Sequence, residues 1–552
     1  MSAHTPHGEA LLTIQLLGTI TLAILVTFAR VGAMLFVSVI LSLVFGILAA
    51  RVKTAEAIII STTDVMEAVP VVSFFPIILS FFLFTIKGGL GVEISADFLI
   101  LTAVIWNLVL GVYEAVARIP EDFENVTSVY RIGLINRIRK VYYPIAVPNI
   151  ISNIMPSFAS ALFYITFSEV ITVGVKDYSV FGIGSIAYSF SAAGNYFAIL
   201  ILVILVIVAI ALVFFFVISP LIDWSKKYTM EFVTANDRNV KRREPRAITN
   251  YFGERLERIM MSAGNVVSGV SAILSPAHYS TERKKYAMSK RLVNALVAMA
   301  LVAAIVFGIY EIALAGFYEA FFTYFVTPAF LSGATLNLAY DLLRIGITYG
   351  ISMITMVPLA IYLGNRQRKG KTTTALMQIM YSIPIPIFVP ILVVVVVPAL
   401  APVMGYDLAL NFEVLLVTYF SAAAYIFFNV YGAVVSIPEE YRMVAKTLKL
   451  GKLQRIRHMI IPSIIPSLIT GSMAAVGSSW GGLSVSEFIS INGNTYSVKH
   501  GLMASIDRAL NAGNLLKTDA IDIFMVIIII ILSFALWIRL YKYAKKRYSF
   551  ST

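Results

Sequence analysis

The run AILILVILVIVAIALVFFFVI at residues 198–218 is apolar at all 21 positions. A helix needs about 20 apolar residues to cross the roughly 30 Å hydrocarbon core of a bilayer, so this run can span one. The whole chain has the same character: 59% of its 552 residues are hydrophobic and 13% are charged, with a mean hydropathy of +0.85. Globular chains carry about a quarter charged residues. The sequence therefore predicts an all-α polytopic membrane protein in a lipid bilayer.

Apolar segments of this kind recur and predict 11 or 12 transmembrane helices, because residues 10–50 fit either one long helix or a hairpin around Arg30. One polar, basic stretch interrupts the series at 223–290. We therefore divide the chain into a first half at 1–222, a cytoplasmic linker at 223–290 and a second half at 291–552. The apolar segments are 10–29, 31–50, 67–86, 97–114, 145–174, 196–222, 292–314, 336–363, 376–400, 412–433, 463–490 and 519–540.

Lysine and arginine are concentrated in alternate loops, and the formal net charge is +13. Cytoplasmic loops of membrane proteins collect such residues, which places loops 115–143, 223–290 and 434–461 and the C-terminus in the cytoplasm of a cell-membrane protein. This explanation of the charge makes a nucleic-acid partner unnecessary. The chain has no cysteine, and its five histidines are scattered, so the sequence indicates no metal site.

The chain contains an internal repeat. VYEAVARIPEDFENVTSVYRIGLINRIRKVYYPIAVPNI at 112–150 returns as VYGAVVSIPEEYRMVAKTLKLGKLQRIRHMIIPSIIPSL at 430–468, an offset of 318. Further upstream, an offset of 314 aligns Arg30 with Arg344 and Pro70 with Pro384. Six crossings separate the two repeated loops, an even number, so both loops face the same side. The sequence thus predicts two tandem helical bundles related as a parallel repeat, with a solute pathway between them.

Each repeated loop is framed by prolines and divides into two short helices at a glycine. We call these loops the first and second elbows. Two basic, helical elbows on one side of the membrane suit the docking of two copies of a partner, and the alternative is a purely structural re-entrant loop. The candidate docking residues are Pro120, Glu121, Arg131, Gly133, Arg137, Arg139, Pro438, Glu439, Lys449, Gly451, Arg455 and Arg457.

The elbows resemble the cytoplasmic coupling loop, or EAA loop, of binding-protein-dependent ABC importer permeases, and most closely that of the nitrate, sulfonate, taurine and bicarbonate group. The chain departs from that pattern where the loop glycine is replaced by Arg131 and Lys449, and Leu162 stands where the second half has tryptophan. The matching residues are Pro438, Glu440, Val444-Ala445, Leu448, Arg457, Ile461-Pro462 and Pro466, with Ile383-Pro384 and Pro390 upstream and Trp480, Ser486 and Glu487 downstream.

The resemblance implies two fused permease halves. It also implies two separate ABC ATPase subunits, one in contact with each elbow, and an extracellular or periplasmic substrate-binding protein that delivers a small-molecule solute. ATP and magnesium would bind to the partner subunits, so the chain itself would need no cofactor. The alternative is a secondary transporter built from two parallel repeats, which would need no ATPase dock.

Glu169 and Glu487 end apolar segments at equivalent positions, and an ionisable group at membrane depth is a functional candidate. With Ser168, Trp480 and Ser486 they form the predicted pathway or gate, and we favour a structural or gating role over solute contact. Gly364–Gly370-Lys371-Thr372 resembles a phosphate-binding loop, but five residues separate its glycines where that motif needs four. We therefore predict that the chain is not an enzyme.

Overall fold

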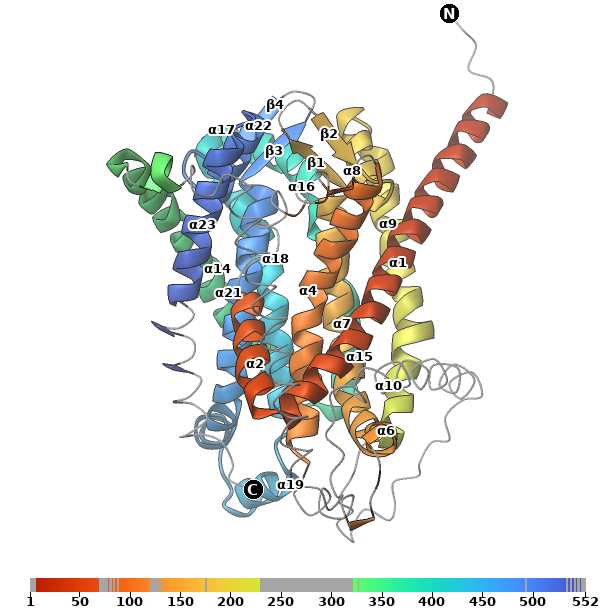
Figure 1. Ribbon diagram of the computed structural model, residues 1–552, viewed down its shortest axis with the longest axis vertical. Coiled ribbons are helices and arrows are strands. Elements are labelled where there is room, and N and C mark those ends of the chain that lie inside the picture. The colour runs from red at the N-terminus through yellow and green to blue at the C-terminus, as the bar shows by residue number, and fades with distance from the viewer. Residues whose placement is uncertain are drawn as a thin grey trace, which may run out of the picture.

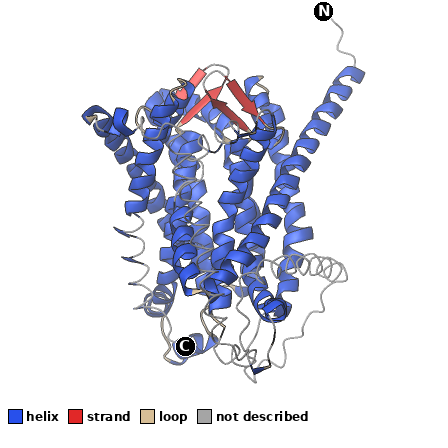
Figure 2. Ribbon diagram, in the orientation of Figure 1, coloured by secondary structure: helices blue, strands red, loops and turns tan. Residues whose placement is uncertain are grey.

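The computed structural model describes residues 6–68, 89–119, 134–173, 176–228, 321–325, 327–491 and 494–532, with isolated positions between these ranges and up to 547. Long helices lie side by side along its longest axis (Figure 1). Two small β-hairpins lie at one end of the bundle, and helices α6 and α19 lie at the other (Figures 1 and 2). We refer to these as the hairpin end and the elbow end.

The first half is built from long helices because its apolar runs continue without interruption, and α1 is one helix where the sequence left one or two open. Its described elements are α1 (Pro6–Arg51), α2 (Lys53–Ala68), α4 (Gly89–Ala117), α6 (Leu134–Arg137), a π-helical turn (Ile138–Tyr142), α7 (Tyr143–Ser168), β1 (Val170–Val173), β2 (Lys176–Ser179), α8 (Ile183–Ala192), α9 (Tyr196–Val213) and α10 (Ser219–Ser225).

The second half repeats this order, and the helices of its elbow are among the described residues. Its described elements are α14 (Pro328–Gly364), α15 (Gln367–Tyr381), α16 (Val389–Ile391), α17 (Val397–Met404), α18 (Tyr406–Val435), α19 (Glu439–Thr447), α20 (Lys452–Arg455), a π-helical turn (Ile456–Ile460), α21 (Ile461–Ser486), β3 (Phe488–Ile491), β4 (Asn494–Ser497), α22 (Leu502–Asn511) and α23 (Leu515–Leu532).

The offset of 318 found in the sequence also relates the helices and strands of the two halves. Helix α7 and helix α21 correspond end to end at this offset, as do the two π-helical turns and the strand pairs β1–β2 and β3–β4. Equivalent helices run in the same direction between the elbow and hairpin ends (Figure 1). The parallel repeat predicted from the sequence is therefore confirmed.

The two halves exchange contacts reciprocally. Helix α2 of the first half packs against α21 and α23, while its counterpart α15 packs against α9 of the first half. At the hairpin end, β1 contacts α22 and β3 contacts α8. Each half therefore braces the other at equivalent places.

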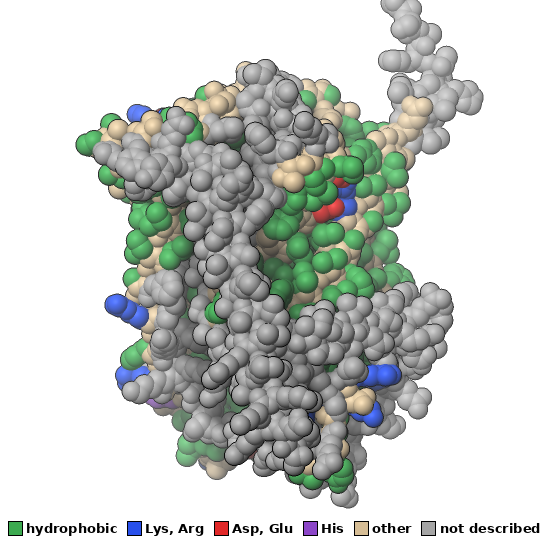
Figure 3. Space-filling model, in the orientation of Figure 1, with side chains coloured by type: hydrophobic (Ala, Val, Ile, Leu, Met, Phe, Trp, Pro, Cys, Tyr) green, Lys and Arg blue, Asp and Glu red, His purple; other side chains and the backbone are tan. Residues whose placement is uncertain are grey.

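Eight helical segments within the described residues are long and apolar enough to cross a membrane. Figure 3 shows apolar side chains on both flanks of the face at mid-height, with lysine and arginine in scattered groups, some of them toward the elbow end. Helix α23 falls outside the eight because Lys517, Asp519 and Asp522 interrupt its apolar run. The predicted segment 292–314 lies outside the described residues, as does most of 67–86, and so does the linker from residue 229 onward.

Three predicted boundaries are corrected. The segment expected at 376–400 is divided, because α15 ends at Tyr381 and the apolar span begins at Ile385, after Pro384. The segments expected at 145–174 and 463–490 end as helices at Ser168 and Ser486, where the chain turns into the hairpins. The strand residues are apolar enough to have extended both predicted helices.

Candidate functional site

The second elbow folds as the sequence predicts, into two short helices joined by a tight turn. Pro438 precedes α19, and the turn between α19 and α20 contains Lys449 in the left-handed conformation, with φ 49°. The Leu450 N–H donates to the Ala445 carbonyl at 3.0 Å, which is the closing bond of a Schellman motif. Lys449 therefore occupies the backbone position that glycine adopts at least cost.

The second elbow exposes several large apolar side chains to solvent. Tyr441, Val444, Leu448 and Leu453 are 45%, 56%, 65% and 78% exposed, whereas Ala445 of the same helix α19 is buried. In the first elbow, Tyr130 lies 318 residues before Leu448 and is 76% exposed. Exposed apolar patches with polar surroundings mark interaction surfaces, and the described part of the first elbow exposes Tyr130 at the position equivalent to Leu448.

Two arginines donate to backbone carbonyls at equivalent positions near the ends of α4 and α18. The Arg442 guanidinium donates to the Val434 carbonyl at 2.8 Å, near the end of α18. In the first half, Arg51 donates to the Val116 carbonyl at 3.0 Å and lies over the Tyr142 ring, 4.6 Å from its centroid. Val116 and Val434 are repeat equivalents, so each helix C-terminus is satisfied by a cation that suits its dipole.

Arg137 and Arg455 share an unusual property. Each is half-buried at the start of a π-helical turn, and the Nε atom of each is buried without a hydrogen-bond partner. Arg139 and Arg457, two residues further on, are exposed.

Part of the predicted docking set cannot be placed. Pro120, Glu121, Arg131 and Gly133 lie outside the described residues, and so does the side chain of Glu439. Gly451 is described and exposed, and it caps α20.

At the hairpin end, Glu169 is fully buried and binds two groups from other elements. Thr27 of α1 donates to its Oε1 at 2.6 Å, and the Gly184 N–H at the start of α8 donates to its Oε2 at 2.5 Å. Thr27 in turn accepts from the Ile183 N–H at 3.0 Å. The carboxylate occupies the space that a Cβ on Gly182 would fill. We call this arrangement the first carboxylate clamp.

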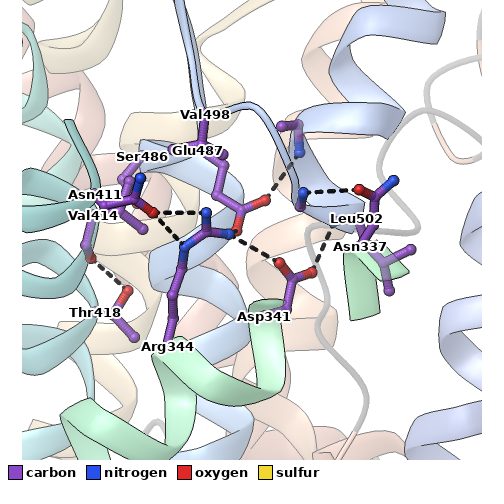
Figure 4. A network of polar contacts seen from close by, with 12 residues as sticks. Asn337, Asp341, Arg344, Asn411, Val414, Thr418, Ser486, Glu487, Val498 and Leu502 are labelled. Carbon is purple, nitrogen blue, oxygen red and sulfur yellow. Dashed lines mark hydrogen bonds and ion pairs between the residues drawn. The ribbon is translucent and has the colours of Figure 1, made fainter. Parts of the chain in front are cut away.

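Glu487 forms the second carboxylate clamp at the equivalent place (Figure 4). It accepts from Arg344 Nη1 at 2.7 Å and from the Ala504 N–H at 3.1 Å. Asp341 takes the place of Thr27 and accepts from the Leu502 N–H at 2.8 Å. A Cβ on Gly501 would overlap the Glu487 carboxylate. Each clamp thus joins the end of a core helix, α7 or α21, to a long helix, α1 or α14, and to a short helix that begins beside a hairpin.

The arginines beside the clamps differ between the halves. Arg344 pairs with both Asp341 and Glu487 and donates to Asn411 at 3.0 and 2.8 Å. Arg30 instead pairs with Glu93 and lies 3.5 Å from Asp97, both on α4. The offset of 314 makes Arg30 and Arg344 equivalent in the sequence but does not indicate a role for either.

The other predicted pathway residues lie inside their own halves. Trp480 is 2% exposed within a core of second-half residues that includes Leu483 and Met525. Ser168 and Ser486 are buried and donate to carbonyls of their own helices, Ile165 at 3.1 Å and Gly482 at 2.7 Å. Their polar groups are therefore satisfied locally.

Two parallel membrane bundles, each with an elbow on the same side, are the architecture of a two-fold permease of a binding-protein-dependent ABC transport system. The chain belongs to the family of binding-protein-dependent transport system inner membrane components, whose profile matches residues 42–224 and again 356–549. It is thus a multi-pass protein of the inner membrane. The family comprises permeases that are not themselves catalytic and hold no cofactor.

Two relatives share part of this chain. Nitrate import permease protein NrtB of Synechococcus elongatus is 27% identical over 181 residues, which cover 31% of this chain and 59% of that protein. The protein of the same name from Leptolyngbya laminosa is 24% identical over 161 residues, 28% of this chain and 52% of that protein. The chain therefore matches somewhat more than half the length of each relative.

Proposed function

We propose that this chain is the transmembrane permease component of an ATP-driven ABC importer and forms the solute pathway between its two fused halves. The duplicated elbow carries the proposal: both copies expose an apolar side chain at the same position, Tyr130 and Leu448, at the elbow end of the bundle. The chain belongs to a family of binding-protein-dependent transport systems. We infer from this that one ABC ATPase subunit binds to each elbow. A secondary transporter would have no use for either surface.

The orientation follows from the charges. The second elbow carries Lys446, Lys452 and Arg457 beside its exposed apolar side chains, and the positive-inside rule assigns such loops to the cytoplasm. The elbows at 115–143 and 434–461, the linker at 223–290 and the C-terminus are then cytoplasmic. The hairpin end faces outward, toward the substrate-binding protein.

The proposed solute pathway lies between the halves, along α7 and α21. Both helices lack any charged residue over their full length, and their polar residues are serine, threonine, asparagine and tyrosine. Hydroxyl and amide groups hydrogen-bond to a passing solute without trapping it as a fixed charge does. The carboxylate clamps hold the outer ends of these helices and take a structural, gating role.

The solute that we propose is a small oxyanion of the nitrate class. The names of both relatives specify nitrate import. Buried carboxylates near the pathway would otherwise repel an anion, but Glu487 is paired with Arg344, and Glu169 is bound by a hydroxyl and a backbone amide. This compensation is partial, because Arg344 offsets one of the two charges that Glu487 and Asp341 can carry and Glu169 has hydrogen-bond donors but no cation of its own. The nitrate assignment therefore rests on the names of the relatives.

Reconstitution tests this proposal. The chain, its ATPase and its binding protein would be placed in liposomes, and nitrate uptake would be followed with and without internal ATP. We expect uptake that requires ATP, the ATPase and the binding protein together. Uptake driven by an ion gradient without the ATPase would establish the secondary transporter instead. ATP-dependent uptake of another solute would refute only the nitrate assignment.

A further inference from the structure

The pathway helices differ at one level where the repeat predicts symmetry. Helices α7 and α21 align position by position in the repeat, with half-buried Ser160 matching half-buried Ser478, and half-buried Phe163 matching buried Gly481. The serines preserve the repeat. At the next level, toward the hairpin end, the first half supplies an aromatic ring and the second half supplies no side chain.

The aromatic rings of the first half lie directly against the glycine of the second. Phe163 and Tyr164 are in T-shaped contact, with centroids 5.2 Å apart and planes at 82°. A Cβ on Gly481 would lie 3.5 Å from Phe163 Cε1 and 3.7 Å from Tyr164 Oη. These are ordinary van der Waals separations, so the α21 backbone approaches the rings as closely as an alanine would permit.

The contact continues outward as an apolar layer that joins the halves. Phe163 and Phe167 of α7 pack against a buried cluster of second-half valines. That cluster consists of Val389, Val393, Val417 and Val485, from α16, the turn after it, α18 and α21. All of these contacts lie in the half of the bundle nearer the hairpins, where the outer mouth of the pathway would be.

A polar contact between the halves lies one turn further in. Ser160 Oγ and Tyr425 Oη are 3.3 Å apart and connect α7 with α18. The equivalent serine makes no such link, because Ser478 donates to the Ser421 carbonyl of its own half at 2.9 Å. The bridge is therefore asymmetric in the same sense as the rings.

We propose that Phe163 and Tyr164 form a one-sided outer seal of the pathway, closed against Gly481 and held by the Ser160–Tyr425 bridge. The inference deepens the proposed function, because it assigns the closed state of that importer to particular residues. Opening toward the binding protein must separate α7 from α21 at this level. The seal therefore stabilises the resting state alone, and weakening it shifts the population toward the outward-open state.

The absence of cysteine from the chain makes the first test direct. The double variant Phe163→Cys/Gly481→Cys would be treated with a short bifunctional thiol reagent in the full complex with its ATPase and binding protein. We expect efficient cross-linking without nucleotide and a loss of about threefold or more when ATP and vanadate trap the closed ATPases. Leu162→Cys/Trp480→Cys is the control pair, because both positions are buried within their own halves, and it should cross-link poorly in either state.

The second test measures ATP hydrolysis without the binding protein. Gly481→Leu should raise it about threefold or more by forcing the seal apart, whereas Gly481→Ala should leave it unchanged because a Cβ fits. Phe163→Ala should also raise it, and Phe163→Ala/Gly481→Leu should return it toward the wild-type rate, since leucine fills the vacated space. A general folding defect would not be rescued in this way.

Different results would refute the importer function and the seal. A wild-type complex that hydrolyses no ATP, together with a Phe163→Cys/Gly481→Cys complex that cross-links equally with and without ATP and vanadate, would overturn the importer and the seal together. A wild type that responds to nucleotide, with Gly481→Leu hydrolysing ATP at the wild-type rate and the cross-link constant, would overturn the seal alone.

Discussion

Glu169 and Glu487 stand 318 residues apart at the same place in the repeat, yet only Glu487 is bound by a guanidinium, that of Arg344 at 2.7 Å. Glu169 is bound by a hydroxyl and a backbone amide. Both side chains are fully buried. The two halves thus solve one problem, the attachment of the hairpin-end helices to the bundle, with different chemistry.

This difference predicts unequal effects when the two equivalent arginines are neutralised. Arg344→Gln leaves two buried carboxylates, Glu487 and Asp341, without their cation and should destabilise the protein by about 3–5 kcal/mol. Arg30→Gln removes a pair with Glu93, whose side chain is 40% exposed, and should cost only about 0–1 kcal/mol. Thermal unfolding of the purified variants in detergent measures both. Similar losses for the two variants would contradict the distinction between the clamps.

The glycines beside the clamps predict a second pair of outcomes. Gly501→Ala places a Cβ on the Glu487 carboxylate, and overpacking of this kind costs about 1–3 kcal/mol. Gly432→Ala is the matched control, because nothing lies within 4 Å of its new Cβ in the last turn of α18. There alanine should be neutral or stabilising by about 0.5–1 kcal/mol. The unfolding temperatures should move in opposite directions, and a tolerated Gly501→Ala would mean that the clamp is loose.

Lys449 predicts a gain of stability within the second elbow. Its φ of 49° is costly for a side chain with a Cβ and easy for glycine, so Lys449→Gly should stabilise the turn by about 1 kcal/mol. Lys446→Gly, inside α19, should weaken the elbow by about the same amount. Amide hydrogen exchange across 439–455 reports the two changes. Faster exchange in Lys449→Gly would show that the turn does not need the left-handed conformation.

The sequence predicts those parts of the structure that depend on neighbouring residues, but not the contacts between residues far apart in the chain. The elbows are local: Pro438, Gly451 and the arginines between two prolines determine short helices and turns, so the pattern located the second elbow correctly. The carboxylate clamps are not local, because Glu487 and Arg344 are separated by 143 positions. Thr27 and Asp341 share an offset of 314 but differ in chemistry, so a search for identical residues passes over them.

The hairpins were missed for a related reason. Val170–Val173 and Phe488–Ile491 are apolar or nearly so and directly continue the apolar segments of α7 and α21. A hydropathy pattern therefore reads strand and helix as one segment. The equal lengths of the two hairpins and their equal registers become meaningful only when the repeat is extended past Glu169 and Glu487.

The exposed apolar residues of the elbows predict how the partner binds. Tyr130→Asp and Leu448→Asp change side chains that are 76% and 65% exposed, so folding should be retained. Each substitution buries a charge in the proposed ATPase contact and should weaken binding by at least about tenfold, a cost of about 1.4 kcal/mol. Leu408→Asp, exposed at the other end of α18, is a control for surface changes away from the elbows. ATPase retention on the immobilised chain measures the effect.

Arg137 and Arg455 should act in the same contact. Replacing both with glutamate should abolish transport while the chain still folds, because their charge is reversed at the base of each elbow. Transport assays beside thermal unfolding distinguish this from collapse of the fold. Unchanged transport would remove both arginines from the docking surface, and Lys499→Glu, at the hairpin end, serves as the comparison.

The most direct test of the account is the mass of the intact complex, purified in mild detergent and measured by native mass spectrometry. The account predicts two ATPase subunits for each wild-type chain, one when either Tyr130→Asp or Leu448→Asp is present, and none with both. Wild-type transport by a chain that carries no ATPase, or two ATPases retained on the double variant, would contradict the claim that the two elbows are the docking sites.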